Sequence, residues 1–108
     1  MIYERRFNRC IHGKEAAFIE NRINIFISYL EKYGAKFVCG VFRYVFGGNS
    51  NEVWYIVGYE DLAHRERVYQ ALQEDEELQK MEAEWAKDPH LHNLSIEVMK
   101  STEYRPTT

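Results

Sequence analysis

The sequence predicts an α+β fold in which a four-stranded antiparallel sheet carries helices on one of its faces. Three features of the chain lead to this prediction. Four segments have the apolar or alternating pattern of strands, the segments between them repeat apolar residues every three or four positions, and a turn cluster separates the second strand from the third. A length of 108 residues is typical of one domain, so we treat residues 1–108 as a single domain.

The first predicted strand covers residues 2–8, and a long helix follows at residues 14–33. Apolar side chains recur along that helix at spacings of three and four, namely Ile19, Ile23, Phe26, Ile27 and Leu30. Gly34 follows, at the place where a glycine often ends a helix in the left-handed conformation. Residues 36–46 are rich in Val and Phe, which predicts the second strand.

Residues 47–50, with the sequence Gly-Gly-Asn-Ser, form a turn cluster before the third strand at residues 51–60. The second and third strands should therefore pair as an antiparallel hairpin. Asp61 then offers a side chain that can cap the start of a charged helix at residues 62–73.

The acidic run at residues 74–77 should break this helical segment in two. The second part carries Leu78, Met81 and Trp85 at spacings of three and four, and Asp88-Pro89 ends it. The last strand, residues 91–104, alternates apolar and polar side chains. The resulting order, β-α-β-β-α-β, is the ferredoxin-like plan.

Both faces of the second and third strands are apolar. On the second strand, one face should carry Phe37, Cys39, Val41 and Val45 and the other Val38, Phe42, Tyr44 and Phe46; on the third, Val53, Tyr55, Val57 and Tyr59 alternate with Trp54 and Ile56. Helices cover only one side of such a sheet, and a second large apolar face on a small protein is normally an interface. We therefore expect a homodimer formed through the sheet face, in which two sheets close into a dimeric α/β barrel.

Composition argues against several classes of partner. A net charge of −3 with interleaved acidic and basic residues leaves no basic stripe for nucleic acid. No apolar run approaches the roughly 20 residues that cross a bilayer, so no membrane partner is expected. The two cysteines, Cys10 and Cys39, are too few for a disulfide scaffold and fit a reduced, cytoplasmic setting.

Residues 51–67, with the sequence NEVWYIVGYEDLAHRER, resemble the signature of the NIPSNAP family, where a strand of the type Asn-Glu-Val-Val-His-Leu-Trp-x-Tyr leads into a helix containing Asp-Arg-x-x-Arg. The start of the chain, residues 1–6, is similar to the family's Met-Ile-Tyr-Glu-Leu-Arg, with Arg6 on the recurrent arginine. Other matching positions are Lys32-Tyr33-Gly34-Ala35-Lys36, Gly47, Asn51, Glu52, Val53, Tyr59, Asp61, Leu62 and Arg65. The ending Tyr104-Arg105-Pro106 is a weaker match to a terminal proline segment of the family. The resemblance implies the dimeric α/β barrel and no settled activity.

The chain departs from the family pattern at Asn8, Tyr55, Val57 and His64. Tyr55 stands where the family commonly carries a histidine, and Asn8 stands where it carries a tyrosine. A cleft that keeps Arg6 and Tyr59 but has these neighbours implies a ligand different from the one typical of the family.

The candidate catalytic residues are Arg6, Tyr55 and His64, and the candidate substrate-binding residues are Glu4, Tyr59, Arg65 and Trp85. Arg6 and Glu4 share one face of the first strand, either as an anion anchor or as a structural ion pair. The two tyrosines share a face of the third strand, where their hydroxyls either bind a carbonyl or phenolate or belong to the core.

His64, beside Arg65, is suited to act as a general base at the mouth of a cleft, or it is a solvated helix residue. Trp85 would be the lid of the cleft or a core aromatic. His90 and His92 lack the further ligands that a zinc site usually needs, and no sequence of a phosphate loop, dinucleotide, haem or flavin site is present, so we expect neither metal nor cofactor.

Two classes of function remain open. In the first, a cleft between sheet and helices binds a small aromatic or carbonyl-bearing molecule and transforms it without a cofactor; related barrels include cofactor-independent monooxygenases, cyclases and isomerases. In the second, side chains fill the cleft and the protein is a non-catalytic interaction module that presents the helix of residues 61–73. An empty cleft reached by Arg6 and Tyr55 would favour the first class, and a filled interior the second.

Overall fold

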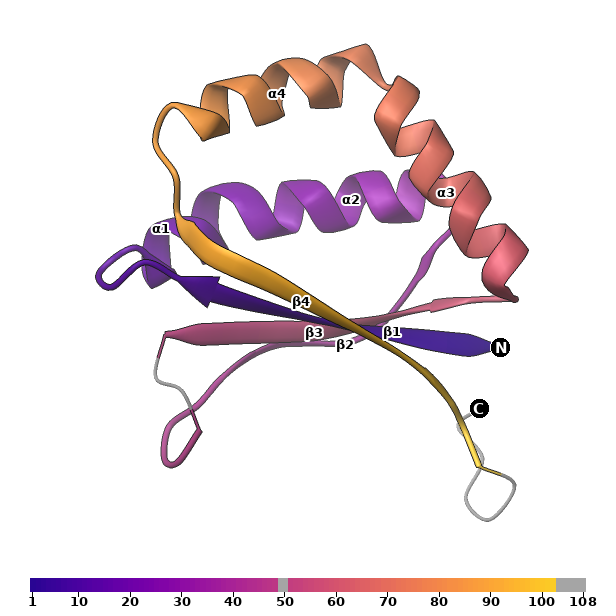
Figure 1. The fold of residues 1–108 in the computed structure, drawn as a ribbon, viewed down its shortest axis with the longest axis horizontal. Coiled ribbons are helices and arrows are strands. Elements are labelled where there is room, and N and C mark those ends of the chain that lie inside the picture. Colours follow the sequence, from indigo (N-terminus) through magenta and orange to yellow (C-terminus); the bar gives the residue numbers. More distant parts are fainter. Residues whose placement is uncertain (49–50, 103–108) are drawn as a thin grey trace.

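The structure, a computed structural model, describes residues 1–48 and 51–102. Its elements are β1 (Ile2–Cys10), α1 (Glu15–Phe18), η1 (Ile19–Ile23), α2 (Asn24–Lys32), β2 (Lys36–Arg43), β3 (Glu52–Tyr59), α3 (Leu62–Glu74), α4 (Glu76–Ala86) and β4 (Leu91–Lys100). The strands form one antiparallel sheet in the order β2-β3-β1-β4, and the helices lie on one side of it (Figure 1). The predicted α+β, ferredoxin-like plan is confirmed.

The first helical segment differs from the single helix predicted at residues 14–33. A π-helical turn, η1, separates α1 from α2. Such a turn holds one more residue than an α-helical turn, so it changes the direction in which the neighbouring side chains point. The apolar spacing of the sequence is compatible with either geometry and gave no sign of it. Gly34 ends the segment with a φ of +110°, as expected of a glycine in that place.

Strand β2 is shorter and less regular than the strand predicted at residues 36–46. It ends at Arg43, and Tyr44, Val45 and Phe46 lie beyond it, so their predicted assignment to sheet faces was wrong. The pairing of β2 with β3 shifts register on both sides of Cys39, which pairs with Ile56 and faces away from the helices. The prediction that Cys39 shares a face with Phe37 was therefore also wrong.

Gly40 gives the physical reason for this irregularity. It has a φ of +132°, and a Cβ atom built on it would lie 2.5 Å from the Cβ atom of Tyr55 on β3. Only glycine fits such a close approach of two strands, and the positive φ interrupts the two-residue alternation on which the sequence prediction relied.

Aspartates mark the start of both helices in the second helical segment. Asp61 accepts a hydrogen bond from the backbone N–H of His64 at 2.7 Å, and Asp75 accepts one from that of Leu78 at 2.9 Å. The predicted break in the acidic run is therefore present between α3 and α4. Strand β4 ends at Lys100, so Ser101 and Thr102, which the predicted strand at residues 91–104 included, lie beyond it. Residues 103–104 of that predicted strand and residues 49–50 of the predicted turn lie outside the described residues.

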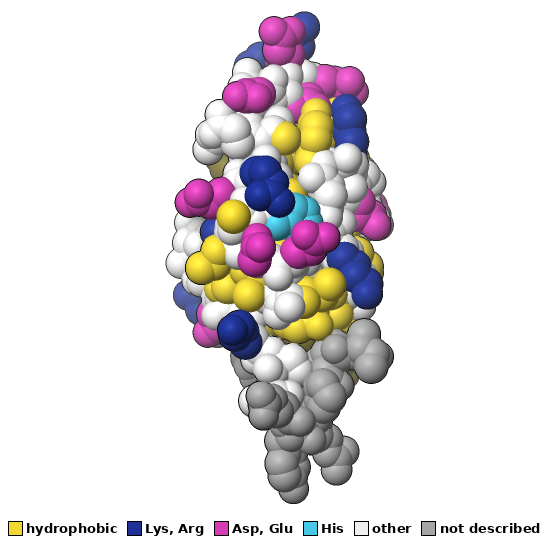
Figure 2. Space-filling model, turned by 90° about the vertical axis from the view of Figure 1, so that its right-hand side faces the viewer, with side chains coloured by type: hydrophobic (Ala, Val, Ile, Leu, Met, Phe, Trp, Pro, Cys, Tyr) yellow, Lys and Arg dark blue, Asp and Glu magenta, His cyan; other side chains and the backbone are white. Residues whose placement is uncertain are grey.

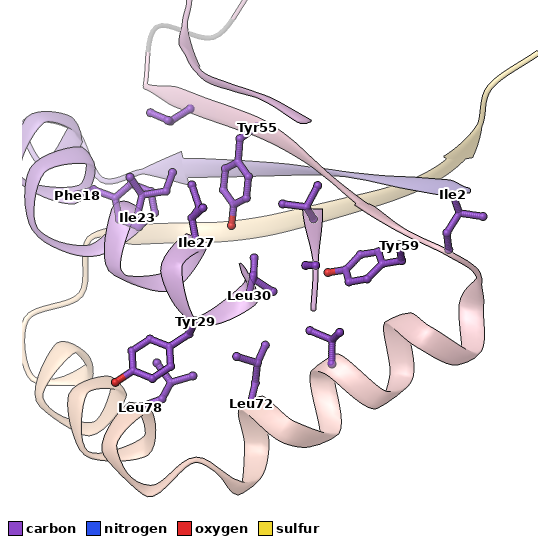
Figure 3. Packing of buried hydrophobic residues seen from close by; sticks show 14 of the residues in the cluster. Ile2, Phe18, Ile23, Ile27, Tyr29, Leu30, Tyr55, Tyr59, Leu72 and Leu78 are labelled. Carbon is purple, nitrogen blue, oxygen red and sulfur yellow. The ribbon is translucent and has the colours of Figure 1, made fainter. Parts of the chain in front are cut away.

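The core lies between the sheet and the helices. Figure 3 shows Tyr55 and Tyr59 projecting from β3 toward the helical layer, where Leu30 of α2 and Leu72 of α3 pack. The side chains that β3 directs to this side are almost fully buried: Val53, Tyr55, Val57 and Tyr59.

The opposite face of the sheet has no helix over it and is aromatic. Trp54 packs on Phe42 with ring centroids 4.7 Å apart, and the Arg5 guanidinium lies 4.2 Å from the centroid of the Phe7 ring. Phe42 is 44% exposed, so part of this apolar surface faces solvent. None of the helices in the described part of the chain is long and apolar enough to span a membrane.

Candidate functional site

A cavity of about 310 Å³ lies under α4, between the first helical segment and strands β1 and β4. Its walls are mainly apolar and aromatic, with contributions from Phe18, Phe26, Tyr55 and Trp85, and a few polar side chains reach it, namely Arg6, Asn8, Arg22, Glu82 and His90. A mainly apolar cavity with a few convergent polar groups is the usual form of a small-molecule site.

The π-helical turn forms one wall of this cavity. Phe18, Arg22 and Ile23, which lie in or beside η1, all line it. Arg22 donates from Nη2 to the backbone carbonyl of Asp88 at 2.7 Å, and its guanidinium lies 5.7 Å from the centroid of the Trp85 ring. These contacts connect the first helical segment to α4 and to the loop before β4, beside the cavity. Such π-helical turns are frequent at functional sites.

A buried polar cluster of Glu4, Arg6, Arg65 and Tyr69 lies at one end of the cavity, where Arg6 is part of the lining. The Glu4 carboxylate is fully buried and accepts from Arg65 Nε at 2.5 Å, from the Tyr69 hydroxyl at 2.6 Å and from Arg6 Nη1 at 3.2 Å. Arg6 Nη1 also donates to the Tyr69 hydroxyl. Glu4 therefore connects strand β1 to helix α3 and fixes the position of Arg6.

The charges of this cluster do not cancel, because one carboxylate faces two guanidinium groups. Burial alone would lower the pKa of Arg6, but the phenols of Tyr55 and Tyr69 and the carboxylate of Glu4 raise it above its ordinary value. Burial raises the pKa of Tyr55 to about 12, although the charge of Arg6 acts in the opposite direction. At neutral pH the cavity is therefore lined by a charged Arg6 and by a protonated Tyr55, whose phenol can donate a hydrogen bond.

Two polar atoms of cavity-lining residues lack hydrogen-bond partners among the described residues. They are Nε of Arg6 and Nδ1 of His90, and both side chains are 6–7% exposed. Because a buried polar atom without a hydrogen-bond partner is costly, each of these two atoms is a place at which a ligand gains a hydrogen bond.

The residues predicted as a site fall into three groups. Arg6, Tyr55 and Trp85 line the cavity, whereas Glu4 and Arg65 lie behind Arg6 and hold it. Their catalytic and binding roles stay predictions.

His64 and Tyr59 form the third group, away from the cavity lining. Their rings meet edge to face with centroids 5.7 Å apart, and His64 Nδ1 accepts from the backbone N–H of Glu60 at 2.9 Å. This contact commits one imidazole nitrogen to the start of α3. Figure 2 shows the end of the molecule from which acidic, basic and apolar side chains all project, so this face presents no extended basic surface.

Sequence reasoning missed several residues of the site. Tyr69 follows Arg65 by four residues and so shares a helix face with it, but this spacing was not used to include Tyr69 among the candidate site residues. Arg22 gave no signal, because its direction depends on the π-helical turn. His90 was considered only as a metal ligand; in the described part of the chain, no three His, Cys, Asp or Glu side chains gather closely enough to hold a metal ion.

Comparison with known proteins gives consistent results. Residues 3–107 match the family model described as NIPSNAP. An uncharacterized NIPSNAP domain protein from Burkholderia xenovorans superposes with a TM-score of 0.84 at 21% identity, covering 99% of this chain and 100% of that one. A NIPSNAP family protein with unknown function from Agrobacterium tumefaciens superposes with a TM-score of 0.83 at 21% identity, covering 98% of this chain and 92% of that one. A second NIPSNAP family protein from that organism superposes with a TM-score of 0.77 at 23% identity, covering 99% of this chain and 98% of that one. Among curated proteins, none matches this sequence.

Proposed function

This chain belongs to the NIPSNAP family, and from that premise we propose that it is a cytoplasmic homodimer that binds a small aromatic or carbonyl-bearing molecule in the cavity between sheet and helices. The observation that carries the proposal is an open cavity reached by both Arg6 and Tyr55. A cavity of about 150 Å³ is enough for benzene, so a volume near 310 Å³ has room for about two fused rings.

The same two side chains give the cavity a means of acting on its ligand without a cofactor. A protonated phenol and a fixed guanidinium are groups that stabilise negative charge developing on a carbonyl oxygen. Their hydrogen-bonding and charge states are set by burial and by Glu4 behind them. Cyclisations, isomerisations and oxygenations that proceed through an enolate or phenolate develop such a charge.

The alternative is a non-catalytic interaction module that presents α3. It requires an interior filled by the protein's own side chains, and the open volume argues against that requirement. Its outward surface would be the exposed polar side of α3, where Glu66, Arg67 and Gln70 lie.

The proposed homodimer forms through the aromatic face of the sheet. This face lies opposite the helices and includes Phe42, Trp54 and Ile56, none of which belongs to the buried core. The cytoplasmic assignment is supported by Cys10 and Cys39, which are both free thiols, as a reducing compartment would keep them.

Native mass spectrometry of the freshly purified protein tests the proposal. We expect a dimer that carries an additional small mass, which is lost on denaturation. The variant Tyr55→Phe should remain a dimer and lose most of that mass, because it lacks the phenolic donor. Tyr3→Phe, on the opposite face of the sheet, is the matched control and should retain the mass. A dimer that never carries a ligand would favour the interaction module, and loss of the dimer in Tyr55→Phe would make Tyr55 a structural residue.

A further inference from the structure

We propose that the ligand of this cavity is an aromatic monocarboxylate, held by a two-pronged contact between its carboxylate and Arg6. The inference rests on the proposed function and specifies its ligand class. It follows from the hydrogen bonds of Arg6, from the charges around the cavity and from the composition of the cavity walls.

The hydrogen bonds of Arg6 leave Nε of its guanidinium without a partner among the described residues. Nη1 of this side chain donates to Glu4 and to the Tyr69 hydroxyl, and the Tyr55 side chain is a further hydrogen-bonding neighbour of the guanidinium. Nε is buried without a partner, although the side chain is 7% exposed and lines the cavity. The edge formed by Nε and Nη2 is one that binds a carboxylate through two parallel N–H···O bonds.

The carboxylates in the described part of the chain do not supply this contact. Glu4 already accepts from Arg6, Tyr69 and Arg65, and its charge is balanced by Arg65 at 2.5 Å. Arg6 is thus a nearly buried cation whose charge has no counterpart of its own within the cluster. A buried charge is costly when it is unbalanced, so an anionic ligand gains a large electrostatic stabilisation at this position.

The charges on the other walls favour one negative charge rather than two. The cavity lining contains Arg6, Arg22 and Glu82 as charged side chains, which sum to one positive charge. Arg22 is engaged with the Asp88 carbonyl and the Trp85 ring. One guanidinium with an unpartnered Nε matches the planar shape and charge of a carboxylate, whereas a phosphate group would bring a second charge without a partner.

The rest of the cavity suits an aromatic ring. Phe18, Phe26 and Trp85 lie in its walls, and the Arg6 guanidinium is 5.0 Å from the centroid of the Phe26 ring. The carboxylate end would therefore lie near Arg6 and Tyr55, and the ring would extend toward Trp85 and Leu94. The volume of about 310 Å³ corresponds to a bicyclic acid of the size of naphthoate.

Isothermal titration calorimetry with a matched pair of probes tests the inference. Naphthalene-2-carboxylate and naphthalene-2-carboxamide have the same shape and differ in charge. We expect the purified, ligand-stripped protein to bind the acid about tenfold or more tightly than the amide, since a charge-assisted pair contributes more than a neutral hydrogen bond. In Arg6→Gln the ratio should fall to near one, and Arg6→Lys should recover only part of it. Arg9→Gln, an exposed arginine of the same strand, is the control and should leave the ratio unchanged.

The outcomes separate the two proposals. Equal binding of acid and amide by the wild-type protein overturns the carboxylate inference and leaves the proposed function in place. Absence of binding of either probe at about 1 mM, together with absence of a co-purified ligand, overturns both. Because the comparison of acid with amide is made on the wild-type protein, it stands even where Arg6→Gln fails to fold.

Discussion

Tyr69 of α3 donates its hydroxyl hydrogen to Glu4 of β1 across 2.6 Å, and the same hydroxyl oxygen accepts a hydrogen bond from Arg6. One side chain of the helix thus bonds to both Glu4 and Arg6 of the strand. It also lies next to Arg65, whose guanidinium is 4.6 Å from the centroid of the Tyr69 ring. The position of Arg6 at the cavity therefore depends on a residue that the sequence analysis left out of the site.

Replacing this phenol should cost stability. Tyr69→Phe removes a hydroxyl that bonds to two charged groups, and hydrogen bonds to charged groups contribute about 1.5–3 kcal/mol. We expect the free energy of unfolding, measured by urea denaturation with tryptophan fluorescence, to fall by about that amount. Tyr3→Phe is the control and should change it by less than about 0.5 kcal/mol. Equal changes in the two variants would show that the Tyr69 hydroxyl has no special role.

Neutralising Glu4 should be more severe. Glu4→Gln keeps the size of the side chain and leaves two arginines, one of them nearly buried, without their shared carboxylate. Removing one partner of a buried ion pair costs about 3–5 kcal/mol, which the same urea experiment would measure.

Glu97→Gln is the matched control for Glu4→Gln. Glu97 of β4 pairs with Arg5 of β1 at 3.7 Å, but its side chain is 58% exposed, so we expect a loss below about 1 kcal/mol. Similar losses in the two glutamine variants would contradict the structural role assigned to Glu4.

The shared face of Glu4 and Arg6 was predictable, whereas the surroundings of that pair were not. Alternation along a regular strand is a local property, and β1 follows it, so the sequence placed both residues correctly on one face. The ion pair that alternation allowed is present at 3.2 Å. Strand β2 broke the same rule, because Gly40 approaches Tyr55 of the neighbouring strand, and this contact is set by packing of residues distant in the sequence.

The cavity, like strand β2, could be predicted from the sequence only in part. Its aromatic lining was partly anticipated through Tyr55 and Trp85, but its shape depends on the π-helical turn and on how far α4 stands from the sheet. Both properties come from tertiary packing and leave no periodic signal in the sequence.

Stability should depend on the ionisation of Asp75 in acid. Its carboxylate accepts from the Tyr33 hydroxyl and from the Leu78 N–H, and these bonds lower its pKa below the ordinary value of 3.8. A pKa lowered by folding contributes stability that is complete above pH 3.8 and disappears as the pH falls through the lower, folded value. In urea denaturation from pH 7 to pH 3, the wild type should have a higher free energy of unfolding than Asp75→Asn, and this difference should shrink as the pH falls.

Asp61→Asn provides the comparison for this experiment, because Asp61 caps α3 as Asp75 caps α4. Both variants retain a side chain that can cap a helix. If the difference in free energy of unfolding between the wild type and Asp75→Asn is constant across the pH range, the Tyr33 and Leu78 contacts do not favour the charged form of Asp75.

The proposed dimer should be sensitive to a charge on the aromatic face of the sheet. Ile56 lies on β3, an interior strand of the sheet, and projects away from the helices. Ile56→Glu would place a carboxylate in the centre of an apolar interface, where an unpaired charge is strongly unfavourable. We expect this variant to be monomeric by size-exclusion chromatography with light scattering while its circular dichroism spectrum stays that of the wild type.

Ala83→Glu, on the exposed side of α4, adds the same charge to the helical face and should leave the dimer intact. If Ile56→Glu remains dimeric, the interface must lie elsewhere. A second apolar surface of the sheet is the row formed by Leu94, Ile96 and Val98 on the helical side of β4, where each side chain is 40–44% exposed. Because Leu94 also lines the cavity, a dimer formed through that row would place the second protomer beside the ligand. Leu94→Glu distinguishes the two arrangements. It should weaken ligand binding alone if the dimer forms through the aromatic face, and both ligand binding and dimerisation if the dimer forms through the row on β4.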